Sequence, residues 1–256
     1  MATIGFIGVG ELALYTIKGV RKGGYQGDIL LSPRNAAKAA WLEQNLKCKV
    51  MADNQSVATN SDYLFIATRP ADCMQTLSEL EFRPDQVLVS VVAGITIAQL
   101  RAAVGNQIQI ARAMPVSSAE AASSPTLIFP AQPFVTEFFD YCGQSIAVDN
   151  EAIFDQGSVL ACVYCWFFTL FEELIQATQG AHLPNDIASK LVMGMARGAA
   201  DLALENKTMP PGEIATAIAT EGTFSKMGLD LLQKSDAFKP WADACLLLKK
   251  QLAKND

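Results

Sequence analysis

The chain has 256 residues, half of them hydrophobic, with a mean hydropathy of +0.20 and a formal net charge of −6. This length suits one large domain or two modest ones, and the absence of a basic stripe disfavours nucleic-acid binding. An acidic surface also disfavours an anionic membrane. The amino terminus lacks the basic region of a signal peptide, and the longest apolar stretch, residues 158–171, is too short to span a bilayer. The six cysteines show no disulfide framework, so we expect a reducing cytoplasm.

The first 150 residues alternate between short apolar runs and helix-length stretches. We expect helices over 11–24 and 35–46. We expect strands over 3–8, 28–32, 49–52, 63–68, 87–92 and 107–113, and two edge strands over 126–130 and 144–149. Strands that are apolar on both faces and alternate with helices predict a mostly parallel sheet covered on both sides. The predicted fold is therefore a Rossmann-type doubly wound α/β sheet.

Strand patterns disappear after residue 150 and helical periodicity takes over. One or two long helices are expected over 150–183, followed by helices over 184–207, 210–220 and within 225–254. The chain thus divides into an NAD(P)-binding domain, residues 1–150, and an all-helical dimerisation and substrate domain, residues 151–256.

The first of these helices carries a cluster of aromatic side chains that covers every face. A helix that is apolar all round is buried on all sides. In a small helical domain this burial needs a partner subunit, so we expect a homodimer formed through the C-terminal helices. The alternative is that Tyr164 or Trp166 lines a substrate pocket. The cluster consists of Tyr164, Trp166, Phe167, Phe168 and Phe171.

Cys162 and Cys165 form a C-x-x-C sequence in the same apolar run. There is no second pair, and His182 is the only histidine in the chain. We therefore expect two small buried side chains and no metal or redox site. His182 is expected in a surface turn between helices.

The first predicted strand ends in G-x-G-x-x-A, formed by Gly8, Gly10 and Ala13. In a dinucleotide-binding turn the first glycine permits the bend and the second lets the backbone approach a diphosphate. The third small residue lets the helix pack on the strand. The helix N-terminus then directs its free N–H groups at the phosphates.

The second strand ends in "LLSPRN", where an NAD enzyme would carry an acidic residue for the ribose hydroxyls. Ser32 and Arg34 stand there instead. Because arginine can donate two hydrogen bonds to a phosphate, the sequence favours NADP(H) over NAD(H). The alternative is that Arg34 is a solvated surface charge.

Four blocks, "IGFIGVGELA", "SDYLFIATRP", "VSVVAGIT" and "RAMP", occur in this order within residues 4–115. They resemble the pyrroline-5-carboxylate reductase family, whose patterns are GFIGxGxMA, an A-x-K-P turn, S-x-x-AGI and R-x-MPN. The resemblance implies NAD(P)H-dependent reduction of a cyclic imine, such as pyrroline-5-carboxylate, to a cyclic amine such as proline. It further implies a role in amino-acid biosynthesis and a dimer with interlocking helical domains.

Carried over position by position, the resemblance assigns cofactor contacts along the first domain. The diphosphate, adenosine and nicotinamide contacts are, in chain order, Gly8, Gly10, Glu11 and Leu12, then Ser32, Arg34 and Asn54, then Ala67, Arg69, Pro70, Ala93, Met114 and Pro115.

The blocks that would hold the substrate differ from the family pattern. Val116 replaces the asparagine of R-x-MPN, and "ATEGTFS" replaces S-P-G-G-T. Reduction of C=N needs a proton donor beside the nitrogen and donors for the carboxylate. Thr223 and Ser225 are the catalytic candidates. Glu221 either faces the pocket, where it would repel an anion, or faces outward as part of the helix start.

Two other functions stay open. One is a hydroxyacid or coenzyme F420-linked NADP oxidoreductase, in which Lys190 would be the nearest helix lysine. The other is an NADP-binding sensor or assembly protein without catalysis, because the substrate blocks are altered.

Overall fold

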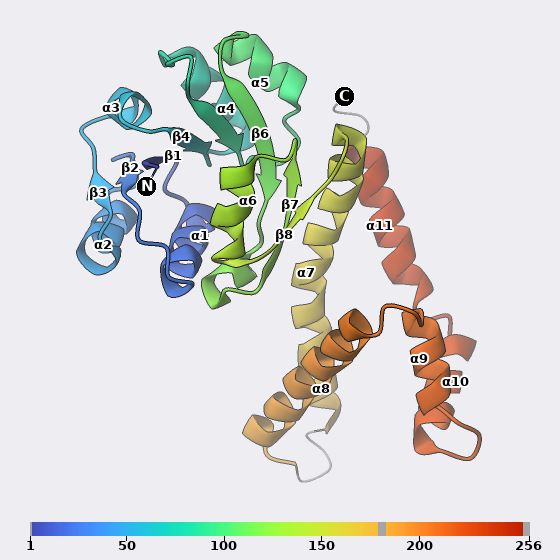
Figure 1. Cartoon of the computed structure of the whole chain (residues 1–256). Coiled ribbons are helices and arrows are strands. Elements are labelled where there is room, and N and C mark those ends of the chain that lie inside the picture. The colour runs from blue at the N-terminus through green and yellow to red at the C-terminus, as the bar shows by residue number, and fades with distance from the viewer. Residues whose placement is uncertain (1, 179–182, 253–256) are drawn as a thin grey trace. The chain divides into compact units, whose positions relative to one another are not determined.

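The computed structural model describes residues 2–178 and 183–252 (Figure 1). His182 lies outside these residues. The first half of the chain forms an eight-stranded sheet of order β3-β2-β1-β4-β5-β6-β7-β8. Its strands are β1 (Ile4–Ile7), β2 (Ile29–Leu31), β3 (Lys49–Val50), β4 (Tyr63–Ile66), β5 (Val87–Ser90), β6 (Gln109–Met114), β7 (Ser124–Phe129) and β8 (Gly143–Ala147).

The sheet is doubly wound, as the sequence predicts. The strands from β1 to β6 pair in parallel, β7 runs antiparallel to β6, and β8 runs parallel to β7. The strand order reverses between β1 and β4. In open sheets of this kind a ligand binds beyond the carboxyl ends of the strands, at this reversal.

Helices cover both faces of the sheet, which explains why its strands are apolar throughout. Phe6 and Phe65 point to one face and Ile7 and Ile66 to the other, as the two-residue period of a strand requires. One face is covered by α1 (Glu11–Lys22), α2 (Ala36–Leu46) and α6 (Pro133–Asp140). The other is covered by α3 (Asn54–Thr59), α4 (Pro70–Ser78) and α5 (Ile97–Val104).

The second half of the chain is helical where it is described, as the sequence predicts. The region expected to hold one or two helices forms the single 28-residue helix α7 (Glu151–Thr178). The others are α8 (Asn185–Glu205), α9 (Pro211–Ile218), α10 (Phe224–Lys234) and α11 (Lys239–Leu252). A short 3-10 helix, η1 (Ser117–Ala121), lies between β6 and β7.

The chain divides into two compact units, with the division inside α7 between Ala161 and Cys162. We call residues 2–161 the amino-terminal unit and residues 162–251 the carboxyl-terminal unit. The sequence-based boundary at 150/151 coincides with the start of α7. The contact boundary lies further along because the first turns of α7 pack against the sheet. For example, a Cβ on Gly157 would lie 2.5 Å from the Leu127 side chain.

Two expectations about α7 need correction. Cys162 and Cys165 are exposed in the single chain, not buried, and Phe167 and Phe168 are also exposed on one side. The run at 158–171 belongs to a longer helix, which is the one helix among the described residues that is long and apolar enough to cross a membrane. The length of the apolar run therefore does not exclude a membrane span, and the exposed side chains need another explanation.

Candidate functional site

The glycine turn between β1 and α1 has the geometry expected of a dinucleotide-binding loop. Gly8 has φ +94°, and a Cβ there would lie 2.6 Å from the backbone of Ala67, so only glycine fits. Gly10 precedes α1, and a Cβ on it would meet nothing within 4 Å. No side chain caps α1, so the N–H groups of its first turn are available to an anion.

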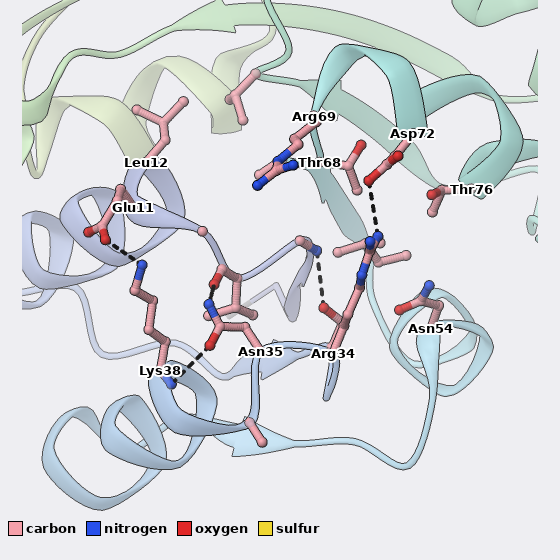
Figure 2. Close-up of a pocket in the computed structure, with 18 residues that line it drawn as sticks. Glu11, Leu12, Arg34, Asn35, Lys38, Asn54, Thr68, Arg69, Asp72 and Thr76 are labelled. Carbon is pink, nitrogen blue, oxygen red and sulfur yellow. Dashed lines mark hydrogen bonds and ion pairs between the residues drawn. The ribbon is translucent and has the colours of Figure 1, made fainter.

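A cavity of about 740 Å³ opens over this turn (Figure 2). It lies wholly in the amino-terminal unit, at the carboxyl ends of β1, β2, β4 and β5. Nine of the cofactor residues expected from the sequence line it, namely Gly8, Gly10, Glu11, Leu12, Ser32, Arg34, Asn54, Ala67 and Arg69. Its open space and free backbone donors fit a dinucleotide diphosphate.

Ser32 shapes the glycine turn directly. Its side chain is buried, and its Oγ accepts a hydrogen bond of 3.0 Å from the N–H of Gly8. Asn35, the N-cap residue of α2, donates a hydrogen bond of 3.0 Å from its Nδ2 to the carbonyl of Val9. The end of β2 and the start of α2 thus hold both sides of the turn in place.

Two ion pairs cross the cavity wall. Arg34 is 3.1 Å from Asp72, and Lys38 is 2.5 Å from Glu11. Figure 2 shows Arg34 reaching toward Asp72 on α4, and Lys38 reaching from α2 toward Glu11. The hydrogen bond from Lys38 lowers the pKa of Glu11 below its ordinary value. Arg69 adds a third cationic group at the start of α4.

Four expected cofactor residues lie outside this cavity lining. Pro70 is the first residue of α4, Ala93 lies in the turn before α5, and Met114 ends β6 with Pro115 after it. All four follow the carboxyl ends of β4, β5 and β6. That is the edge of the sheet on which the cavity opens.

Sequence reasoning missed several residues of the cavity. Lys38 gave no signal in the sequence, because its partner Glu11 lies 27 residues away. Asp72 gave no such signal, because its pairing with Arg34 joins segments 38 residues apart. The missed lining residues are Ile7, Val9, Asn35, Ala36, Lys38, Thr68, Asp72, Thr76 and Val91.

The catalytic candidates lie at the start of α10, in the carboxyl-terminal unit. Thr223 caps this helix, accepting from the N–H of Lys226 at 3.2 Å and donating to the carbonyl of Thr220 at 2.7 Å. Ser225 and Glu221 are exposed in the single chain. Gly222 between them has φ +81°, which only glycine adopts readily. The turn therefore keeps the hydroxyl-bearing residues Thr223 and Ser225 beside a left-handed glycine.

A buried ionic cluster lies at the end of β6. Arg112 is 2% exposed and pairs with Glu151 at 2.6 Å and Asp155 at 2.8 Å, both on α7. Its guanidinium also stacks on Phe154, with the carbon 4.4 Å from the ring centre. Glu151 accepts a further hydrogen bond of 2.7 Å from the N–H of Ile97, which begins α5. This cluster joins β6, α5 and the first turns of α7.

No group of three or more histidine, cysteine, aspartate or glutamate side chains among the described residues is arranged to hold a metal ion.

The fold and the glycine-turn cavity define the class: a Rossmann-type dinucleotide-binding domain followed by a helical domain. Comparison with known families agrees with this. Residues 3–94 match the model for NADP oxidoreductases, coenzyme F420-dependent. Residues 151–250 match the model for pyrroline-5-carboxylate reductase dimerisation. The two models, with the relatives described next, support the pyrroline-5-carboxylate reductase family for this chain.

Individual relatives extend over nearly the whole chain. The pyrroline-5-carboxylate reductase of Pasteurella multocida is 28% identical and aligns with 98% of each chain. That of Escherichia coli is 26% identical over 86% of this chain and 85% of its own. Among solved structures, the NADP-bound pyrroline carboxylate reductase of Plasmodium falciparum superposes with a TM-score of 0.86 at 18% identity, covering 99% of this chain and 98% of its own. This last similarity concerns the fold.

Proposed function

We propose that the protein is an NADPH-dependent reductase of a carbon–nitrogen double bond, with pyrroline-5-carboxylate or a related cyclic imine as substrate and proline or a related cyclic amine as product. The observation that carries the proposal is the cavity over Gly8 and Gly10, with Arg34 in place of a ribose-binding acid. The two matched family models and the curated relatives support the reaction class. When bound, NADPH supplies the hydride.

Residues of this chain would bind the cofactor and the substrate. The first turn of α1 would bind the diphosphate, and Arg34 with Asn54 would hold the phosphorylated adenosine ribose. Ala67, Pro70, Ala93, Met114 and Pro115 would flank the nicotinamide along the sheet edge. Ser225 would donate a hydrogen bond to the substrate. Thr223, the other catalytic candidate, donates its hydroxyl proton to the Thr220 carbonyl in this structure and would have to release that bond to act as a donor. Glu221 at this turn either faces outward or favours a cationic iminium over an anion.

The active form is proposed to be a homodimer formed by the helical domains, in the cytoplasm. The match of residues 151–250 to a dimerisation model supports this. So do the exposed apolar side chains of the carboxyl-terminal unit, which a second copy would cover. We assign α7 to this interface and not to a lipid bilayer. The free thiols of all six cysteines are consistent with a reducing compartment.

The cofactor assignment is tested by titrating NADPH and NADH against the protein and against Arg34→Met. We expect NADPH binding to weaken by about tenfold or more, because a charge-assisted phosphate contact is lost. NADH binding should change little. Arg197→Met, at an exposed site on α8, is the matched control. Equal losses for both cofactors would contradict the role of Arg34, and no binding of NADPH to the unaltered protein would overturn the proposal.

A second candidate is an NADP-binding sensor or assembly protein without turnover. It is favoured by Glu221 and Val116, which stand where the family pattern has proline and asparagine. NADPH oxidation with pyrroline-5-carboxylate, other cyclic imines and 2-keto acids separates the candidates. Turnover of an imine supports the reductase, and turnover of the keto acids supports a hydroxyacid-type oxidoreductase. NADPH binding without turnover of any of them supports the sensor.

A further inference from the structure

The glycine turn contains one feature that works against cofactor binding. Glu11 is the first residue of α1 and lines the cavity. Its negative charge therefore belongs to the same helical turn as the N–H groups that would receive the diphosphate. An acidic side chain stabilises the free helix at this position through the helix dipole. It also repels a second anion at the same helix end.

Lys38 is placed to cancel this charge. It lies in the first turn of α2, and its Nζ contacts Glu11 Oε1 at 2.5 Å. Its side chain is largely covered, with 28% of its surface exposed. Of the other cations that line the cavity, Arg34 pairs with Asp72, and Arg69 lies at the start of α4. Lys38 is thus the cation in direct contact with Glu11.

We propose that Lys38 is a positioning residue of the cofactor site, which neutralises Glu11 and so lets the diphosphate approach the start of α1. The inference rests on the proposed function, because it assumes that a dinucleotide occupies the cavity. Lys38 acts through Glu11 and not through the adenosine phosphate. The diphosphate is common to NADPH and NADH, so Lys38 affects both cofactors, unlike Arg34.

A double-mutant cycle tests this proposal. Lys38→Met should weaken the binding of NADPH and of NADH by the same factor, about three- to tenfold, as expected for one exposed charge near another. Glu11→Gln should tighten both by a similar factor. The double variant Glu11→Gln, Lys38→Met should bind both cofactors nearly as well as the unaltered protein. Lys49→Met, at an exposed site on β3, controls for the change in net charge.

The outcomes are distinguishable. If the double variant binds as weakly as Lys38→Met, Lys38 contacts the cofactor itself and the proposal fails. If Lys38→Met weakens NADPH binding alone, Lys38 belongs to the adenosine phosphate site and the proposal also fails. Melting temperatures without cofactor show whether a variant is merely unstable; recovery in the double variant is a result that simple destabilisation does not give. If the unaltered protein binds neither cofactor, the proposed function fails first.

Discussion

The amino-terminal and carboxyl-terminal units differ in how far they bury their large apolar side chains. In the first, Phe6, Phe65 and Phe138 are fully buried between the sheet and its helices. In the second, Phe224 is 89% exposed and Met195 is 70% exposed. A soluble monomer rarely leaves so much apolar surface in contact with water. The first unit completes its core within one chain, and the proposed homodimer would explain why the second unit leaves these side chains exposed in the single chain.

The largest expected effect comes from substitutions on the exposed face of α8, which test whether a second copy covers the carboxyl-terminal unit. Leu191 and Met195 lie one turn apart on that face. Replacing both by aspartate would bury charge in the dimer, so we expect the dissociation constant to rise by about 1000-fold, or ~4 kcal/mol. Light scattering after size exclusion should show a dimer for the unaltered protein and a monomer for the variant.

The control exchanges the two apolar residues, as Leu191→Met with Met195→Leu. This variant keeps the face apolar and should remain a dimer. A monomeric unaltered protein would overturn both the proposed homodimer and the explanation given for the exposed side chains.

The buried ionic cluster of the amino-terminal unit should cost more to break than an ion pair in the carboxyl-terminal unit. Arg112→Met leaves Glu151 and Asp155 without their cation, and we expect a loss of about 3 kcal/mol in the free energy of unfolding. Arg197→Met removes an exposed pair with Asp201 on α8 and should cost about 0.5 kcal/mol or less. Urea denaturation measures both. Equal losses would mean that burial does not distinguish the two pairs.

Alkaline pH should lower the free energy of unfolding of the amino-terminal unit, because three of its cysteine thiols are buried. Burial raises the pKa of Cys142 from 9.0 to about 12. Between these values the unfolded chain loses a proton that the folded chain retains, so stability falls as pH rises, by about 1.4 kcal/mol per pH unit for this thiol. Below pH 9 its contribution is fully present.

Denaturation measured between pH 9.5 and 11 checks this expectation. Cys142→Ala should flatten the decline, although the burial of Cys48, whose pKa is raised to about 11, leaves part of it. An unchanged slope in Cys142→Ala would contradict the assignment.

The smallest expected effect concerns the glycine turn, where alanine substitutions at Gly8 and Gly10 should have different consequences. Gly10→Ala adds a methyl group that meets no protein atom but enters the space reserved for the diphosphate. We expect an unchanged melting temperature and about tenfold weaker NADPH binding, a loss of ~1.4 kcal/mol. Gly8→Ala should instead lower the melting temperature, because φ is +94° and the Ala67 backbone blocks the methyl group. Full NADPH affinity in Gly10→Ala would place the cofactor elsewhere.

The sequence by itself determined the sheet, the helical second half and about half of the residues that line the glycine-turn cavity. Strand and helix periods are local properties, and the two-sided apolar pattern of strands such as β1 and β4 requires helices on both faces. The glycine turn is equally local, because Gly8 and Gly10 belong to one bend. Arg34 could be assigned from the strand end that it follows.

Only the tertiary structure decided which distant side chains meet. Asp72 pairs with Arg34, and Glu151 and Asp155 pair with Arg112, across separations in sequence that no periodicity encodes. The exposure of Cys162 and Phe168 likewise depends on what packs around α7, since an apolar helix looks the same in sequence whether its cover comes from its own chain or from another. Local order follows from neighbouring residues, whereas contact and burial follow from the folded arrangement of the whole chain.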